Sequence, residues 1–392
     1  MTEKVLRPLT SKALRIAALL LFLTSAGQAQ VHFDFSGYVV DLPIFQSTSK
    51  LLSQAIGTDQ NHLLNLTRAR FRPTVNLSPN ARISLEYELT ALYHSTARPF
   101  ASISDVTNRQ TLGLRWDPVR QDHLTVSHFV DRLYLRQNFD LGNIIVGRQR
   151  IAWGTGRVWN PTDLFNPINP ATFDKIEKDG ADAVSVKLYL GSFTDLHVVY
   201  NSQSSFDEHN LGVRFRTNAA EYDWSAVLGY FDKRYIIGGD FAGNLFDAGV
   251  RGEGILSIDE QEVGSNFVKF IIGLDNQFTS RLYALIEYQF NGEGRTDQSS
   301  YDLSRLVAGE ILNLSKSYVF VHASYLLHPL LTASLSLNAN LNDGSGFVGG
   351  LASYSMTENL YVHVGGLVFY GDRFDEYWYY PDSAYLKGEW YF

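Results

Sequence analysis

Residues 331–342, with the sequence LTASLSLNANLN, alternate strictly between apolar and polar side chains. Leucine or alanine stands at every odd position, and threonine, serine or asparagine stands at every even one. A β-strand places successive side chains on opposite faces, so this stretch predicts a strand with one apolar and one polar face. Residues 81–94 follow the same rule, with Leu85 and Tyr87 opposite Glu86. In a transmembrane β-barrel the apolar face meets lipid and the polar face meets the lumen.

The same period of two recurs through most of the chain and predicts an all-β fold, an antiparallel transmembrane barrel of about eighteen strands. The predicted strands lie near 33–40, 64–77, 81–94, 126–139, 142–152, 181–190, 194–202, 209–217, 221–231, 234–241, 245–258, 266–276, 281–291, 317–328, 331–341, 347–356, 359–370 and 384–392. The 234–258 hairpin has the weakest pattern, and sixteen strands result if it belongs to a loop.

Short turns and long links alternate between these strands. The long links are predicted at 41–63, 95–125, 153–180, 292–316 and 371–383. Bacterial outer-membrane barrels have short periplasmic turns and longer outer loops, which places both chain ends on the periplasmic side and requires an even strand number.

The first 29 residues have the plan of a signal peptide, so we expect the mature barrel domain to span 30–392. Four basic residues precede the apolar run 16–23, and a small-x-small pattern follows at 27–29. Eight apolar residues are far fewer than the roughly 20 that a membrane-spanning helix needs. We therefore predict export and location in the outer membrane of a Gram-negative cell, in contact with its lipid.

Removal of these residues takes away four basic groups and one acidic group, which leaves 29 Lys+Arg against 40 Asp+Glu, a formal charge of −11. Such an acidic chain is not expected to bind nucleic acid. It has no cysteine, which excludes disulfides and thiolate metal sites, and its ten histidines show no metal-ligand spacing. We expect no metal and no cofactor.

The C-terminal end alternates up to an aromatic residue, with Leu386, Gly388, Trp390 and Phe392 on one face and Tyr391 on the other. This end resembles the last strand of outer-membrane barrels. The resemblance implies that the barrel-assembly machinery recognises Phe392. A periplasmic or inner-membrane transport partner is a further expectation for an export channel.

Charged side chains in the strands are expected to face the lumen, because an Arg or Lys facing lipid at the bilayer midplane costs about 2–4 kcal/mol. The predicted pore-lining residues are Arg68, Arg70, Arg72, Arg132, Tyr134, Arg136, Arg148, Arg150, Arg214, Arg216, Glu86, Glu88 and Glu287. Glu253 and Asp275 are further carboxylates on the same inward face. Either the arginines form a wall that favours anions, or they are paired with the carboxylates and only stiffen the barrel.

The segment 147–170, GRQRIAWGTGRVWNPTDLFNPINP, ends a strand and then contains three Asn-Pro steps, which favour turns. It either folds inward as a constriction or caps the barrel outside. The constriction candidates are Trp153, Arg157, Trp159 and Asp163. This GRQ…WG…NP pattern, with GLD at 273–275 and EYQFNGEG at 287–294, resembles an uncharacterised family of outer-membrane barrels similar to porins and polysaccharide-export channels.

We therefore expect a channel or export pore for hydrophilic, anionic solutes or a polymer, and no enzymatic activity. A non-conducting structural or adhesin-like barrel is the alternative. His322 and Ser324 share a strand face and resemble the His-x-Ser arrangement of outer-membrane lipid hydrolases, but Tyr325-Leu326 follow where that pattern has Asn-Gly. Residues 301–312 are predicted to form a short helix in an outer link.

Overall fold

The computed structural model describes residues 31–96, 109–165, 177–203, 205, 208–307 and 311–392. The predicted signal peptide and the last Asn-Pro steps of the 147–170 segment lie outside these residues. Most of the described residues lie in β-strands, and the helices are short. Its strands are β1 (His32–Ser47), β2 (Asn61–Ser78), β3 (Ala81–His94), β4 (Arg115–Arg120), β5 (Leu124–Phe139), β6 (Gly142–Gln149), β7 (Ala181–Tyr189), β8 (Asp195–Asn201), β9 (Asn210–Ala219), β10 (Tyr222–Phe231), β11 (Arg234–Leu245), β12 (Ala248–Asp259), β13 (Phe267–Gln277), β14 (Leu282–Asn291), β15 (Ser317–His328), β16 (Leu331–Asn340), β17 (Gly346–Ser355), β18 (Leu360–Tyr370) and β19 (Asp382–Tyr391). The short helices are α2 (Lys50–Ile56), η2 (Val263–Ser265), η3 (Gln298–Ser300), α3 (Leu303–Val307) and η4 (Glu376–Tyr379).

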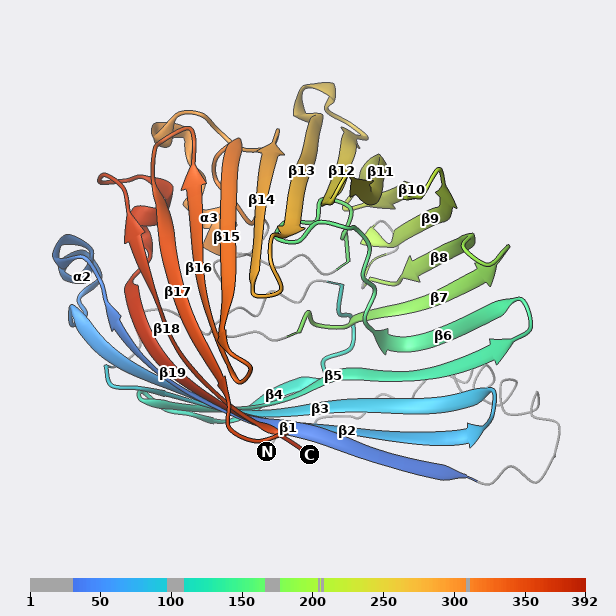
Figure 1. The fold of residues 1–392 in the computed structure, drawn as a ribbon, viewed down its shortest axis with the longest axis horizontal. Helices are drawn as coiled ribbons and strands as arrows, with labels where there is room; N and C mark the ends of the chain where they lie inside the picture. Colours follow the sequence, from blue (N-terminus) through green and yellow to red (C-terminus); the bar gives the residue numbers. More distant parts are fainter. Residues whose placement is uncertain (1–30, 97–108, 166–176, 204, 206–207, 308–310) are drawn as a thin grey trace, which may run out of the picture.

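The strands form one antiparallel barrel, which closes where β1 pairs with β19 (Figure 1). Consecutive strands are neighbours around the whole barrel, except that β3 pairs directly with β5. The short strand β4 pairs only with the part of β5 that extends beyond the end of β6. Without this patch the wall has eighteen strands, so the predicted number is confirmed.

Each of the eighteen predicted strands corresponds to one observed strand, including the weak hairpin, which is β11 and β12. The prediction of a long link at 41–63 is wrong at both ends, because β1 continues to Ser47 and β2 already begins at Asn61. The alternation continues through this part of β1, where Leu42 and Ile44 are buried. The short strand β4 was not predicted, and α3 lies within the predicted helix 301–312.

The outward face of the barrel is apolar and exposed. Leu335, Val364 and Leu228 expose more than half of their surface. An apolar surface that continues around a whole barrel belongs in lipid, where a closed sheet also satisfies every backbone group. The long links lie at one end of the barrel, and the two chain ends lie at the other. No helix in the described ranges has the length and hydropathy to cross a membrane.

The inward face is less uniformly polar than the alternation predicts. Inward side chains of β8, β10 and β12, among them Val199, Phe231 and Ile255, form a buried apolar cluster with Trp153 and Phe165 of the 150–165 segment. A second cluster joins Ile271 and Tyr318 of the wall to other side chains that enter the barrel. These inward positions are apolar because they pack against chain that lies inside the barrel.

Candidate pore and constriction

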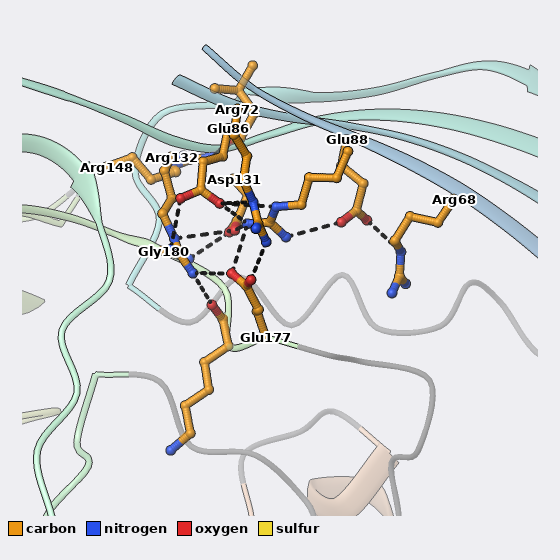
Figure 2. A network of polar contacts seen from close by, with 12 residues as sticks. Arg68, Arg72, Glu86, Glu88, Asp131, Arg132, Arg148, Glu177 and Gly180 are labelled. Carbon is orange, nitrogen blue, oxygen red and sulfur yellow. Dashed lines mark hydrogen bonds and ion pairs between the residues drawn. The ribbon is translucent and has the colours of Figure 1, made fainter. Parts of the chain in front are cut away.

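The arginines of β2 form an ion-pair network with β3 and β5 (Figure 2). Antiparallel pairing places Arg70 directly opposite Glu88, and its guanidinium also binds Glu86 at 2.8 Å. Arg68 lies 3.1 Å from Glu88, and Arg132 of β5 lies 2.9 Å from Glu86. Arg68, Arg70 and Glu86 therefore meet as cross-strand neighbours on the inward face.

A β-bulge in β5 adds an acid to this network that the sequence pattern does not reveal. The register shifts between Tyr87 and Glu86, so that Asp131 and Arg132 both turn inward. Asp131 is fully buried, binds Arg70, and accepts a hydrogen bond from the N–H of Gly180 at 2.8 Å. A bulge is visible in a sequence only as a local break in alternation, which is too weak a signal to locate it.

The last member of the network is Glu177, which comes from the link between β6 and β7. It binds Arg72, and its Oε2 lies 2.9 Å from Arg132. Burial alone would raise the pKa of Glu177, but the charges of Arg70, Arg72 and Arg132 hold this pKa below its ordinary value. It is therefore ionised at neutral pH, and it ties its link to the wall.

The network is neutral as a whole. It contains four guanidinium groups and four carboxylates, from Arg68, Arg70, Arg72, Arg132, Glu86, Glu88, Asp131 and Glu177. Arg68 and Arg70 are buried. Of the two interpretations of the arginine ladder, this geometry matches the paired one.

The segment 150–165 lies inside the barrel, held by two buried carboxylates. Glu253 of β12 accepts hydrogen bonds from the backbone N–H groups of Thr155, Gly156 and Thr162 at 2.7–3.1 Å. An irregular segment inside a barrel leaves its backbone N–H groups without ladder partners, and each such unpaired group is costly. Glu253 supplies the missing acceptors.

Glu287 of β14 has the same role for the next turn of the segment. It accepts hydrogen bonds from the N–H groups of Arg157, Val158 and Trp159 at 2.8–3.2 Å. Gly154 fits this arrangement because it has a positive φ of 91° and because a Cβ there would lie 2.6 Å from a Glu253 oxygen. Glu253 and Glu287 thus accept hydrogen bonds from six backbone N–H groups and fix the path of the segment.

The four constriction candidates lie in different surroundings. Trp153 and Trp159 are each 2% exposed and pack against the wall, and Asp163 is buried and paired with Lys178. Arg157 differs, because its side chain is 52% exposed and its guanidinium lies 3.6 Å from Asp275. Arg157 is therefore the candidate that the segment presents to open space.

Two cavities lie on either side of this segment, and Arg157 lines both. The outer cavity, of about 760 Å³, is bounded by the link-side ends of β10 to β14. The inner cavity, of about 660 Å³, is bounded by the turn-side ends of β11 to β14. Arg157 is therefore common to the walls of both cavities, one at the link-side end of these strands and one at the turn-side end.

The outer cavity has more basic than acidic residues in its wall. The basic ones are Arg109, Arg157, Lys178, Arg234, Lys269 and Arg305, and the acidic ones are Asp163, Asp232 and Glu293. Burial would raise the pKa of Glu293, but Lys269 at 2.7 Å and Arg305 hold it below its ordinary value. Arg109 was not predicted as a site residue, and it reaches the cavity from a distant link, paired with Asp232.

The link 371–381 also contributes buried chain. Glu376 of η4 accepts hydrogen bonds from the N–H of Leu314 at 3.0 Å and from Asn340 at 2.9 Å, and it is bonded to Tyr318. Tyr377 packs on Phe347. Burial raises the pKa of Glu376 to about 7. We call this link the η4 strap.

The remaining predicted residues lie apart from the two cavities. Arg214 contacts Asp240 at 3.6 Å, and Arg136 donates a hydrogen bond to Asn138 at 2.9 Å. Tyr134 and Arg216 face inward by register, opposite Ser84 and Ser225, and Arg150 follows the end of β6.

Arg148 has a different position from the one expected of a lumen-facing side chain. It is 1% exposed, it binds Asp182 at 2.8 Å, and it donates to the carbonyl oxygens of Val130 and Leu112. Its register partner Leu133 is exposed on the outward face. Arg148 is therefore enclosed in the wall where the chain of 111–112 crosses it.

His322 and Ser324 both face inward, as predicted, but they do not form a dyad. A hydrogen bond of 2.8 Å joins His322 Nδ1 to Ser336 on the neighbouring strand. On β15 the outward-facing neighbours of His322 and Ser324 are Val321 and Tyr325, which are exposed. The pair therefore does not reach the lipid surface, where a lipid hydrolase would need it.

The sequence matches no family model and no curated protein sequence. The fold, in contrast, is similar to solved outer-membrane porins. OccD3 of Pseudomonas aeruginosa aligns over 94% of this chain and 94% of its own, with a TM-score of 0.55 and 8% identity. OccAB4 of Acinetobacter baumannii aligns over 93% and 99%, with a TM-score of 0.56 and 9% identity. OccK11 of Pseudomonas aeruginosa gives 0.54 over 92% and 95%, with 9% identity. At such low identity the likeness concerns the fold, and the chain has the fold of an 18-stranded outer-membrane porin.

Proposed function

We propose that this protein is an outer-membrane channel for small hydrophilic anions, and that solutes pass through the two cavities beside Arg157. The observation that carries the proposal is the position of Arg157 in the walls of both cavities, with half of its side chain exposed. A solute that moves between the two cavities passes this guanidinium. A fixed charge at a narrow point of a pore governs which ions pass.

The preference for anions rests on the outer cavity rather than on the arginine ladder. Six basic and three acidic residues line this cavity, and two further carboxylates, Asp275 and Asp259, pair with Arg157 and Arg234, so the basic groups exceed the acidic ones by one in a chain of negative net charge. Local field, and not net charge, determines which solutes concentrate at an entrance. The ladder contributes little to this field, because its charges cancel within the network.

Single-channel recording in planar bilayers tests the proposal. In a salt gradient the wild type should have the reversal potential of an anion-preferring channel, and Arg157→Gln should shift it towards cation preference. The shift should shrink at high salt, because the Debye length falls from about 10 Å at 0.1 M to about 3 Å at 1 M. Arg120→Gln is the control, because Arg120 is an exposed arginine of β4 on the outer rim.

A cation-preferring wild type, or equal reversal potentials for Arg157→Gln and Arg120→Gln, contradicts the anion path. A wild type that is folded but conducts nothing supports the second candidate, a non-conducting structural or adhesin-like barrel. That candidate is favoured by the buried chain inside the barrel, in which Trp153, Trp159 and Tyr377 are nearly inaccessible. Passage of a polymer, as in export channels, is the less favoured form of the channel proposal, because Arg157 is common to the walls of both cavities.

A further inference from the structure

The wall of the outer cavity contains three amide side chains that are more than nine-tenths buried. Gln289, Asn291 and Asn313 are 7%, 4% and 4% exposed, and all three line this cavity. In each of them the amide oxygen accepts no hydrogen bond from any residue that the structure describes. A buried acceptor without a donor is costly, so these oxygens are expected to bind a donor that the chain itself does not supply. We call the three residues the amide wall.

The orientation of one of these amides is fixed by its neighbours. The Nδ2 group of Asn291 donates hydrogen bonds to the carbonyl oxygens of Asn313 and Ser315, at 3.4 and 3.1 Å. The Oδ1 atom of Asn291 is therefore the unused acceptor, and Asn313 lies beside it. Gln289 faces inward two residues earlier on β14, so its Cα lies about 7 Å from that of Asn291. The amide wall thus offers a row of acceptors rather than a single one.

The charged groups of the same cavity, in contrast, are paired with each other or with nearby acids. The pairs are Lys269 and Arg305 with Glu293, Arg234 with Asp259, Arg109 with Asp232, Lys178 with Asp163, and Arg157 with Asp275. Much of the hydrogen-bonding capacity of these groups is used within the chain. The amide oxygens differ from them, because pairing leaves the amide oxygens unused.

The kind of donor that suits the amide wall follows from its neighbours. Lys269 of β13 is the register partner of Asn291, and its positive charge disfavours an ammonium group there. Trp159 also lines the cavity, and its buried indole N–H has no acceptor within the described ranges. A carboxylate only accepts hydrogen bonds and an ammonium only donates them, whereas a hydroxyl does both. Hydroxyl groups therefore suit both the amide oxygens and the indole N–H.

We propose that the amide wall binds the hydroxyl groups of a polyhydroxylated solute, either a sugar acid or a neutral sugar alcohol. A row of acceptors matches a chain of several hydroxyls better than a solute with one polar end. A site that hydrogen-bonds hydroxyl groups also rejects an analogue without them, because its own polar groups are then left unpaired. The proposal rests on the proposed function in one respect, namely that solutes enter the outer cavity.

Calorimetric titration of the full-length protein in mild detergent measures this preference. The probes are D-gluconate and hexanoate, which have the same chain length and charge, and the uncharged D-sorbitol. Gluconate should bind at least about tenfold more tightly than hexanoate, because hexanoate leaves the amide wall unpaired. Sorbitol shows whether the anionic end contributes. If sorbitol binds as tightly as gluconate, the result supports the amide wall and counts against the anion path.

Gln289→Met tests the amide wall directly, because methionine has nearly the volume of glutamine but lacks its amide oxygen. The affinity for gluconate should fall about three- to tenfold, which corresponds to one hydrogen bond, and the affinity for hexanoate should not change. Asn313→Leu is a second variant of the same design. The matched control is Gln121→Met, at an exposed position between β4 and β5 and outside both cavities. Heat-modifiable gel migration verifies that each variant forms a barrel.

Equal affinities of the wild type for gluconate and hexanoate would overturn the proposal, as would an unchanged preference in both Gln289→Met and Asn313→Leu. A wild type that binds neither gluconate nor sorbitol overturns it as well, since water then satisfies the amide wall. These results leave the anion path untouched, because the reversal potential of Arg157→Gln decides it. Conversely, a cation-preferring wild type that still prefers gluconate to hexanoate supports the amide wall and contradicts the anion path.

Discussion

Arg70 takes part in the ion-pair network of the barrel wall, although the sequence favoured a role for it in ion selectivity as one of two interpretations. Its guanidinium contacts Glu86, Glu88 and Asp131, and its side chain is buried. A buried charge of this kind is hard to replace, because its removal leaves carboxylates unpaired in a place of low polarity. Breaking one partner out of a buried ion pair typically costs 3–5 kcal/mol.

We therefore expect Arg70→Gln to lower the free energy of unfolding by about 3–5 kcal/mol, measured by urea titration of the barrel in detergent micelles. Arg136→Gln is the matched control and should change it by less than about 1 kcal/mol, because Arg136 donates to an amide rather than to a carboxylate. Equal stability of the two variants, together with a shifted reversal potential in Arg70→Gln, would instead support a role of these arginines in ion selectivity.

The second prediction at the residue scale concerns Phe392. Phe392 exchanges backbone hydrogen bonds with Gly37, and its ring packs on Phe35, Phe71 and Trp390. We propose that the barrel-assembly machinery also recognises it. Deletion of Phe392 should strongly reduce the heat-modifiable fraction in outer membranes, whereas Tyr391→Phe should reduce it little, because Tyr391 faces inward and bonds Glu389. Equal folding of both variants would contradict this role.

At the scale of elements, the 150–165 segment and the η4 strap differ from ordinary loops because buried acids hold them. Glu253 and Glu287 accept backbone hydrogen bonds from the first, and Glu376 connects the second to β15 and β16. Acidic side chains on the inner surface of the barrel therefore determine the path of the chain that the barrel encloses.

Replacement of both tethers, in Glu253→Gln/Glu287→Gln, should release the 150–165 segment. We expect a larger single-channel conductance and more frequent current fluctuations, because each amide offers one acceptor oxygen where the carboxylate offered two. Glu358→Gln, at an exposed turn, is the control. An unchanged conductance in the double variant would show that this segment does not limit the current.

The η4 strap should respond to pH. The pKa of Glu376 is raised to about 7 from an ordinary value of 4.5, so the folded strap binds the proton more tightly than the released one. Its stability is then greatest at low pH, falls as pH rises from about 4.5 to 7, and is constant above that. Protease cleavage within 371–381 should accelerate over this range, and Glu376→Gln should abolish the change. A wild type with pH-independent cleavage, corrected for the protease's own profile, contradicts the burial argument.

The strands were predictable from the sequence, and the side-chain network was not. Lipid outside and water inside impose a period of two on every strand, which is why 331–341 and its counterparts were found. The β-bulge that turns Asp131 inward has no periodic signature in the sequence. Nor does the contact that Glu177 makes with the wall from a distant link.

At the scale of the whole molecule, the barrel has one rim of long links and one of short turns. The structure shortens the predicted link 41–63 to residues 48–60. If the long links are outside the cell, protease added to intact cells should cut within 48–60 and should spare the turn at 278–280. Permeabilised cells provide the control, since both rims are then accessible. Cleavage of intact cells at 278–280 would reverse the orientation.

The seam between β1 and β19 has a consequence for biosynthesis. Gly37 and Phe392, which meet there, are 355 positions apart in the chain, so the seam cannot form on a ribosome that has yet to add the last residue. Until then both edge strands have unpaired backbone groups, and an exposed edge invites pairing with other chains. A newly made chain therefore remains an open sheet until β19 has been made, and a chain truncated before β19 would stay open and prone to aggregation.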